Sequence, residues 1–277
     1  MTSQRILLGC DPELFLRNPN SGSYFSAHDM IPGTKDEPHK VPNGMVQVDG
    51  TALEFGIDPA ATEDEFVSRI ASVKNTLREM VDPGYEIVAH PVATFEPAYF
   101  KTLPPWAIEL GCTPDYNAWT GDVNPHPNQR ATFRTGSGHI HIGWTQGADI
   151  YSATHIETCR AVARQMDYYL GIYSVLWDKD TKRRELYGKA GAFRIKPYGV
   201  EYRTLSNRWT ESEMLMRWVY RAALKGTTDL LFYGKDATQE YGNVAVDIIN
   251  HSDETWQKWA DIDVGLINPP VGVRKAA

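Results

Sequence analysis

Apolar and charged side chains alternate along five short segments of the chain. In each segment one face is hydrophobic and the opposite face is charged. A period of two residues is typical of a β-strand, because successive side chains point to opposite faces of a sheet. We therefore expect strands at residues 9–15, 52–57, 138–143, 192–196 and 200–204.

A helical pattern covers residues 62–81, where apolar residues recur three and four positions apart. Thr62 and Glu65 have the spacing of a capping box, and Asp82-Pro83-Gly84 ends the pattern. Thr210 and Glu213 repeat the capping-box spacing. The further expected helices are 154–177, 210–225 and 238–259, and Gly242 and the Asn250-His251-Ser252 cluster indicate an interruption in the last.

Length and composition favour one globular domain over residues 1–277. A chain of 277 residues that is 42% hydrophobic can bury a large core. Two stretches rich in Pro, Gly and Asn, residues 18–43 and 103–129, are expected to be long functional loops rather than linkers between domains.

Charge and cysteine content narrow the partners and the compartment. The net charge of −7 is spread without a basic block, so we expect no nucleic-acid partner. Cys10, Cys112 and Cys159 are odd in number and widely spaced, which favours reduced, buried thiols in a cytoplasm. No apolar run reaches the ~20 residues of a membrane span, and residues 1–8 lack the features of a signal peptide. We expect a cytoplasmic protein without a membrane partner.

The charged faces of the expected strands carry side chains that suit a binding site. An ordinary solvated sheet face is rich in Thr, Lys, Ser and Gln, whereas these faces offer carboxylates, imidazoles and guanidinium groups. Residues two apart project together, which pairs Asp11 with Glu13, His139 with His141, Arg194 with Lys196 and Glu201 with Arg203, and leaves Glu54 alone on its strand.

Each group also has a structural interpretation. Asp11 and Glu13 can be ordinary solvent-exposed polar residues, and a His-x-His pair can have a purely structural role. Glu54 lies among apolar residues and needs a partner, which is either a cation or an arginine from the later strands. Arginines beside acidic residues indicate a phosphoryl group held between a metal and a guanidinium, or a structural ladder of ion pairs. The coincidence of five such strands favours a functional site.

Four motifs together resemble a known family. In this order and spacing they resemble the phage-type carboxylate-amine (COOH-NH2) ligases, a branch of the glutamine synthetase and glutamate-cysteine ligase superfamily. The resemblance implies an α+β fold with a curved, largely antiparallel sheet, an active site on its concave face and helices on its convex side. The motifs are GCDPELFL, VDGTALEFGID, GSGHIHIG and GAFRIKPYGVEYRTLSN.

The resemblance also implies roles for the charged residues. Glu13, Glu54, His139 and Glu201 correspond to metal ligands, and so does Asp11, although related enzymes often have Glu at that place. The residues implied to bind the nucleotide or its phosphates are His141, Arg194, Lys196 and Arg203, and those implied to act in catalysis are Glu54, Arg194 and Arg203.

The implied activity is ATP-dependent amide-bond formation through an acyl-phosphate, with Mg²⁺ or Mn²⁺ as the metal. The substrates are expected to be a small-molecule or peptide carboxylate and an amine. If the protein is phage-encoded, the reaction takes place in the host cytoplasm. The sequence does not decide whether the protein forms a homo-oligomer. The loop at 103–129, with Trp106, Tyr116, Trp119 and His126, either lines the acceptor pocket or packs over the helices.

Two alternatives remain open from the sequence. His139, His141 and a carboxylate can form a transition-metal triad, which predicts a metallohydrolase or a metal-dependent oxygenase that needs no nucleotide. The arginine-rich strands argue against this reading. The second alternative is a non-catalytic member of the fold that only binds a peptide or a nucleotide.

Overall fold

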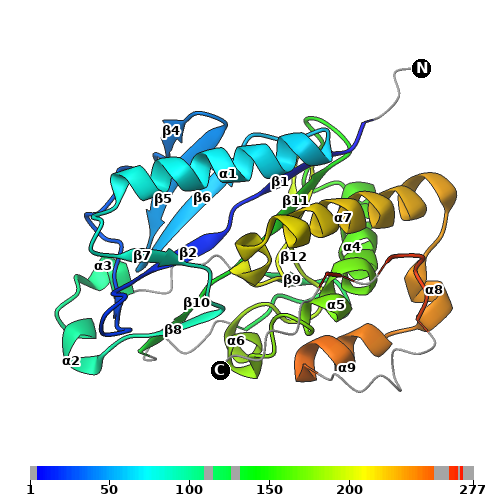
Figure 1. Ribbon diagram of the computed structural model, residues 1–277. Coiled ribbons are helices and arrows are strands. Elements are labelled where there is room, and N and C mark those ends of the chain that lie inside the picture. Colours follow the sequence, from blue (N-terminus) through cyan, green and yellow to red (C-terminus); the bar gives the residue numbers. More distant parts are fainter. Residues whose placement is uncertain (1–4, 109–114, 126–131, 253–261, 268, 271–277) are drawn as a thin grey trace.

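A long bent segment, β1 (Leu7–Cys10) followed by β2 (Glu13–Arg17), runs through the middle of the molecule (Figure 1). The computed structural model describes residues 5–108, 115–125, 132–252, 262–267 and 269–270. β1 and β2 each belong to a different half of the sheet, so this segment joins the two halves.

The first half contains four of the expected charged strands. Its order is β1-β11-β13-β12-β9, and all of these neighbours are antiparallel. The later strands are β9 (Tyr116–Asn117), β11 (Ile140–Gly143), β12 (Ala192–Lys196) and β13 (Gly199–Tyr202).

The second half is built on β2 and has the order β3-β2-β6-β5-β4, with β7 also paired to β2. A separate antiparallel pair joins β8 (Val92–Thr94) and β10 (Phe133–Thr135). The strands of the second half are β3 (Tyr24–Phe25), β4 (His39–Val41), β5 (Gly44–Asp49), β6 (Ala52–Ile57) and β7 (Glu86–Val88).

Hydrogen bonds across the bend make the two halves one curled antiparallel surface. The amide of Asp11 donates to His139 O at 3.4 Å, and the amide of Glu13 donates to Ser137 O at 2.9 Å. On the other side, the amide of Phe55 donates to Pro12 O at 3.2 Å. Pro12 has no N–H to donate, so strand pairing breaks there without leaving an unsatisfied donor.

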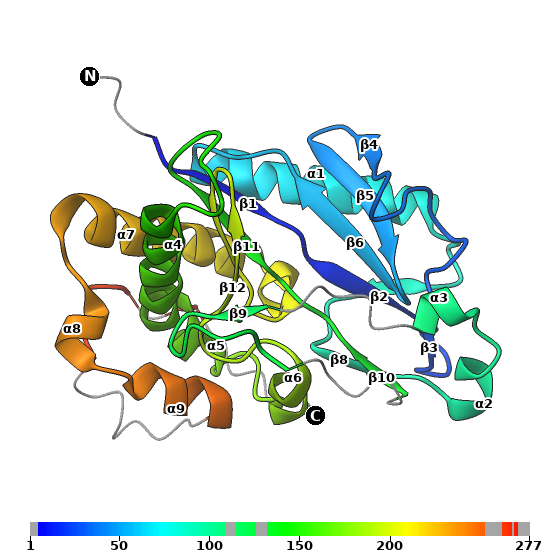
Figure 2. The same cartoon turned by 180° about the vertical axis from the view of Figure 1, so that it is seen from behind.

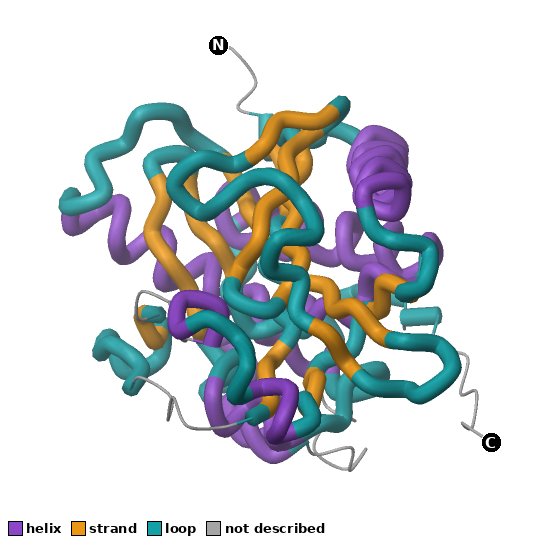
Figure 3. Tube along the Cα trace, turned by 90° about the vertical axis from the view of Figure 1, so that its left-hand side faces the viewer, coloured by secondary structure: helices purple, strands orange, loops and turns teal. Residues whose placement is uncertain are grey.

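Helices cover the face that carries the apolar side chains. α1 (Glu63–Met80) packs on β5 and β6, and α4 (Ala153–Met166) packs on β12 and β13. α1 lies in front of β5 and β6 in Figure 1 and behind them in Figure 2, whereas the helices flank a central group of strands in Figure 3. The α+β architecture expected from the family resemblance is therefore confirmed.

The remaining helices complete this layer and its surroundings. The core they enclose includes Leu8, Leu53, Phe55, Ile140 and Tyr202 from the apolar sides of the strands. These helices are α2 (Pro97–Phe100), α3 (Pro105–Ile108), α5 (Ile172–Ser174), α6 (Thr181–Leu186), α7 (Glu213–Tyr233), α8 (Ala237–Tyr241) and α9 (Val244–His251).

Two helix predictions are confirmed and one is refined. Thr62 caps α1, and its capping box with Glu65 is formed. The expected break at Gly242 separates α8 from α9, and the end of that prediction, residues 253–259, lies outside the described residues. The helix expected at 154–177 is interrupted after α4 by a π-helical turn, Asp167–Gly171.

The expected start and end of α7 are wrong. The hydroxyl of Thr210 donates to Asn207 O at 2.8 Å inside a 3₁₀ turn, and Ser212 takes the N-cap position. α7 also continues past Lys225 to Tyr233. A Cβ at Gly226 would lie 2.7 Å from Met166 Cε, so this glycine permits close helix packing instead of ending the helix.

The strand predictions hold at their centres and shift at their ends. The segment expected at 9–15 is split at Asp11-Pro12, and β11 and β13 are assigned shorter than expected. Cys10 and Cys159 are buried free thiols, as predicted, whereas Cys112 lies outside the described residues. Within the described ranges, no helix has the length and apolar character needed to span a bilayer.

Candidate active site

Strand register brings the predicted residues together in rows. His141 on β11 pairs with Glu201 on β13, and Glu201 pairs with Arg194 on β12. Directly opposed residues of antiparallel strands project to the same face. The next row begins at Asp11, whose amide bonds to the carbonyl of His139. Because the period is two, both rows face away from α4.

The same argument applies to the second half of the sheet. Glu13 on β2 pairs with Glu54 on β6, and Glu54 pairs with Gln47 on β5. We call the combined surface the charged face. It carries every site residue predicted from the sequence: Asp11, Glu13, Glu54, His139, His141, Arg194, Lys196, Glu201 and Arg203.

Three of these residues form a metal-binding geometry. One side-chain ligand atom from each of Asp11, His141 and Glu201 lies within 4.8 Å of the other two. His141 Nε2 is 3.1 Å from Asp11 Oδ1. Carboxylate oxygens with one imidazole are donors that suit Mg²⁺ or Mn²⁺.

His139 lies deeper than His141 and has a different environment. Its Nδ1 is 3.2 Å from Asp11 Oδ1 and 3.2 Å from Arg203 Nη1. Burial and the charge of Arg203 lower the pKa of His139. Burial lowers the pKa of His141, but the charge and hydrogen bond of Asp11 together with the charge of Glu201 outweigh it and raise the pKa. The geometry thus groups His141 with the acidic ligands, whereas the family resemblance implied that His139 was the metal ligand.

Arginine and lysine surround Glu201 at the centre of the charged face. Lys196 Nζ is 2.7 Å from Glu201 Oε2, Arg194 Nη1 is 3.8 Å from Oε1, and Arg203 also forms an ion pair with Oε1. Burial raises the pKa of Glu201, but the combined attraction of Arg203, His141 and His139 outweighs it and the pKa falls to about 2. Glu201 is therefore ionised at every physiological pH.

The opposite end of the charged face is acidic. Glu54 accepts a hydrogen bond from Gln47 Nε2 at 2.7 Å, and Glu13 accepts one from the amide of Ser137 at 2.9 Å. Burial, and then the charge of Asp49, raises the pKa of Glu54 well above its usual value and that of Glu13 to about 7. Several carboxylates close together in a poorly hydrated hollow repel one another, and a nearby positive charge would stabilise their ionised forms.

The partner of Glu54 decides between its two interpretations. Among the described residues, the side chain that contacts Glu54 is Gln47. In the described part of the chain Arg194 and Arg203 pair with Asp115 and Glu201, and no ion pair joins either of them to Glu54. A cation as the partner of Glu54 stays a prediction.

Three functional candidates were missed in the sequence. Asp115 lies 2.5 Å from Arg203 Nε and 3.7 Å from Arg194 Nε, Tyr198 hydrogen-bonds to His141 Nδ1, and Asp49 pairs with Lys35 at 2.7 Å. Asp115 and Tyr198 lie in loops without a period, and no pattern in the sequence could identify them.

Two residues of the aromatic loop have different surroundings, and the role of this loop at an acceptor pocket stays a prediction. Tyr116 lines a pocket at the edge of β12, whereas the indole of Trp119 donates to Asp167 Oδ2 at 2.6 Å and packs toward the helices. Trp106 is 54% exposed and lies beside His28. His126 lies outside the described residues.

A cavity of about 1050 Å³ opens over the charged face, and we call it the large cavity. Asp11, Glu54, His141 and Lys196 contribute to its wall, and Arg5 and Trp144 lie at its periphery. This volume accommodates a ligand of nucleotide size. The metal-binding geometry therefore lies at the wall of a cavity that can admit such a ligand.

Comparison with known proteins gives one family. Residues 122–227 match the family model described as phage phiEco32-like COOH.NH2 ligase-type 2. This segment is less than half of the chain, and it contains β11, β12, β13 and α4 but not β1, β2 or β6. No curated protein matches the chain. The matched segment contains His139, His141, Arg194, Glu201 and Arg203, and it is similar to the phage phiEco32-like COOH.NH2 ligases, a family named for carboxylate-amine ligation.

Proposed function

We propose that this protein is an ATP- and Mg²⁺-dependent ligase that joins a carboxylate to an amine through an acyl-phosphate. The observation that carries the proposal is the convergence of Asp11, His141 and Glu201 within 4.8 Å, on the face that also presents Arg194 and Arg203. Metal ligands beside guanidinium groups fit phosphoryl transfer, in which catalysis is mostly positioning and charge stabilisation.

The donor set fits a hard divalent cation. Asp11 and Glu201 offer oxygens and His141 offers one imidazole, while Glu13 and Glu54 extend the acidic wall along β2 and β6. Burial and the charge of Asp49 raise the pKa values of Glu13 and Glu54, so a bound cation would favour the ionised form of both carboxylates. Mg²⁺ held there would neutralise the charge of the nucleotide phosphates.

The cationic residues would then act on the transferred phosphoryl group. A carboxylate is a poor electrophile, so its oxygen first attacks the γ-phosphorus of ATP and ADP leaves. The amine attacks the acyl carbon next, phosphate leaves and the amine loses a proton. Arg194, Lys196 and Arg203 surround Glu201 and lie where they can stabilise the phosphoryl oxygens.

Tyr198 and Asp115 support this arrangement from outside the strands. Tyr198 contacts His141 Nδ1, so it orients the ring whose Nε2 faces Asp11. Partners of this kind commonly fix the tautomer and angle of a metal-binding histidine. Asp115 holds Arg203 from the side opposite Glu201.

The test is a coupled assay of the purified protein with ATP, Mg²⁺ and a panel of amino acids and peptides. We expect release of ADP that depends on the added acid and on the metal, and trapping of the acyl-phosphate as a hydroxamate when hydroxylamine replaces the amine. Glu201→Gln should abolish both signals. Glu79→Gln, an exposed carboxylate of α1 on the other side of the sheet, should change neither. Hydrolysis of an amide or ester without nucleotide, and no ADP in any mixture, would refute the proposal.

A further inference from the structure

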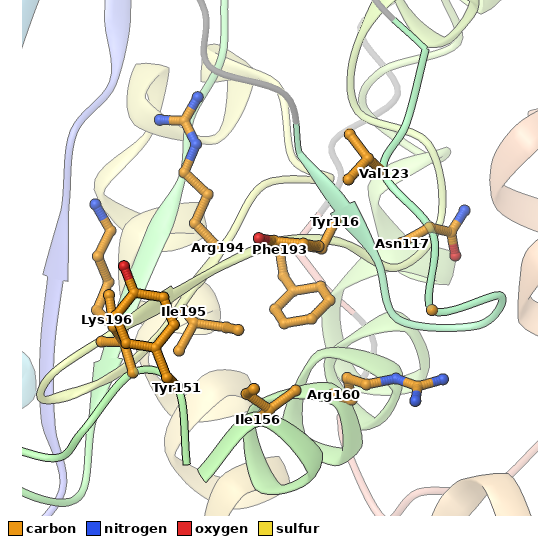
Figure 4. Close-up of a pocket in the computed structure, with 12 residues that line it drawn as sticks. Tyr116, Asn117, Val123, Tyr151, Ile156, Arg160, Phe193, Arg194, Ile195 and Lys196 are labelled. Atoms are coloured by element: carbon orange, nitrogen blue, oxygen red, sulfur yellow. The ribbon is translucent and has the colours of Figure 1, made fainter. Parts of the chain in front are cut away.

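A second cavity, of about 540 Å³, lies at the edge of the first half of the sheet, and we call it the edge pocket. Its wall comes from the β9 hairpin, from β12 and from the start of α4 with the residues before it. Phe193 and Ile195 of β12 lie near Tyr116 and Ile156 (Figure 4). The edge pocket is therefore on the apolar side of β12, behind the charged face.

The described lining of the edge pocket combines apolar side chains with cationic ones. Its apolar part includes Phe193, Ile195, Ile156 and Val123, and the ring of Tyr116 lies 5.9 Å from that of Phe193. Among the residues that the structure describes, the charged side chains of the wall are Arg160, Arg194 and Lys196, and no Asp or Glu lines it. Such a wall suits a molecule with an apolar body and a negative charge.

Two residues connect the edge pocket with the charged face. Arg194 extends away from Phe193 and Ile156 in Figure 4, and its guanidinium reaches Glu201 at 3.8 Å. Lys196 lines both the edge pocket and the large cavity, and its Nζ is 2.7 Å from Glu201. A ligand that crosses the edge of β12 can thus place an apolar group in the edge pocket and a carboxylate beside Arg194 and Lys196.

The two positions lie on opposite sides of one strand, so a single small amino acid is too short to fill both. An extended peptide advances about 3.3 Å per residue, and two or three residues bridge a strand edge. We infer that the acid substrate is the carboxyl end of a peptide, with its terminal carboxylate at Arg194 and Lys196 and a preceding apolar or aromatic side chain in the edge pocket.

The role of this peptide as a substrate rests on the function proposed above, but its binding does not. The probe is N-acetyl-Phe-Ala, measured by calorimetry with the full chain and without nucleotide. We expect it to bind at least tenfold more tightly than N-acetyl-Ser-Ala, than its own carboxamide and than alanine. Equal affinity for the four compounds, or no binding of N-acetyl-Phe-Ala, would overturn the inference.

Variants of the wall locate the site. Val123→Asp places a negative charge in the edge pocket on a side chain that is 51% exposed, and we expect it to weaken N-acetyl-Phe-Ala about tenfold. Met214→Asp makes the same kind of change on an exposed residue of α7 that lines neither cavity, and it should leave binding intact. Tyr151→Ala removes an 84% exposed wall residue and should weaken binding in a fully folded protein.

The two proposals fail separately in these measurements. Binding of Mg²⁺-ADP is measured on the same variants, and Val123→Asp should not change it. If Mg²⁺-ADP binds normally while Val123→Asp and Tyr151→Ala bind the peptide as the wild type does, the edge pocket is not the peptide site. Peptide binding that responds to both variants supports the edge pocket even in a protein that never forms ADP.

Discussion

Arg203 Nε lies 2.5 Å from Oδ1 of Asp115, so a loop carboxylate holds a guanidinium of the charged face. The other side of the same guanidinium contacts Glu201. The side chains of Arg203 and Asp115 are almost fully buried, at 4% and 6% exposure. Asp115 and Glu201 both lie within ion-pair distance of this guanidinium, so their charges favour its position on the charged face, and position is what the recognition of phosphate requires.

Asp115→Asn should therefore impair turnover without removing any group of the charged face. We expect kcat for ADP formation to fall about 100-fold, because a guanidinium displaced by about 1 Å loses that much in rate. The affinity for Mg²⁺-ADP should change less than kcat. Asp122→Asn, an exposed aspartate after the β9 strand, is the matched control and should behave as the wild type does. Unchanged kcat in Asp115→Asn would mean that Arg203 does not need its loop partner.

The charged face could be predicted from the sequence because charged and apolar residues alternate along its strands. Once Glu13, Glu54, His141 and Glu201 lie on alternating strands, antiparallel register alone aligns them. Asp115 has no such signal, since its place depends on how a long loop returns to the edge of β12.

The ends of α7 also could not be predicted from the local sequence. The pattern around Thr210 and Glu213 matches a capping box, but the hydroxyl of Thr210 bonds within the preceding 3₁₀ turn instead. Gly226 has the propensity to end a helix, yet tight contact with Met166 and Tyr169 keeps it inside α7. Tertiary contacts determine the helix structure at both positions, and the local sequence pattern does not reveal these contacts.

Glu54→Gln should separate folding from catalysis. The amide keeps the shape of the side chain and can still contact Gln47, but it cannot supply a negative charge to a cation. We expect Mg²⁺-dependent ADP formation to fall about 100-fold or more. Because burial and Asp49 disfavour the charged form of Glu54, the melting temperature should be retained or rise. Circular dichroism and the coupled assay measure the two effects, and normal turnover would remove Glu54 from the mechanism.

Arg203→Lys tests whether geometry or charge matters at this position. The guanidinium contacts Asp115 through Nε and Glu201 through Nη1, and one ammonium cannot span both. We expect about a 100-fold loss of kcat with the fold intact. Arg208→Lys, whose arginine pairs with Glu211 at the surface, should be neutral. Wild-type rates for Arg203→Lys would show that a point charge is enough.

Asp167 should make stability depend on pH in the acidic range. This carboxylate is fully buried beneath β13, where it accepts hydrogen bonds from Tyr202 at 2.7 Å and from Trp119 at 2.6 Å. Burial raises the pKa of Asp167 to about 6, against these hydrogen bonds, while an unfolded chain has a pKa of about 3.9. Between these values the folded state retains a proton that the unfolded state has lost.

The sign of the effect follows from that difference. Since the folded state binds more protons, the free energy of unfolding contributed by Asp167 falls as pH rises from about 4 to about 6, by about 3 kcal/mol. Asp167→Asn cannot titrate, so its stability relative to the wild type should increase by about that amount across the same interval. Any cost of the amide to the hydrogen bonds of Trp119 and Tyr202 is the same at every pH and does not alter this slope. Urea unfolding of both proteins at pH 4, 5 and 6.5 measures how their free energies of unfolding change with pH, and Glu79→Gln is the exposed control. If the free energies of Asp167→Asn and the wild type differed by the same amount at every pH, the raised pKa would be contradicted.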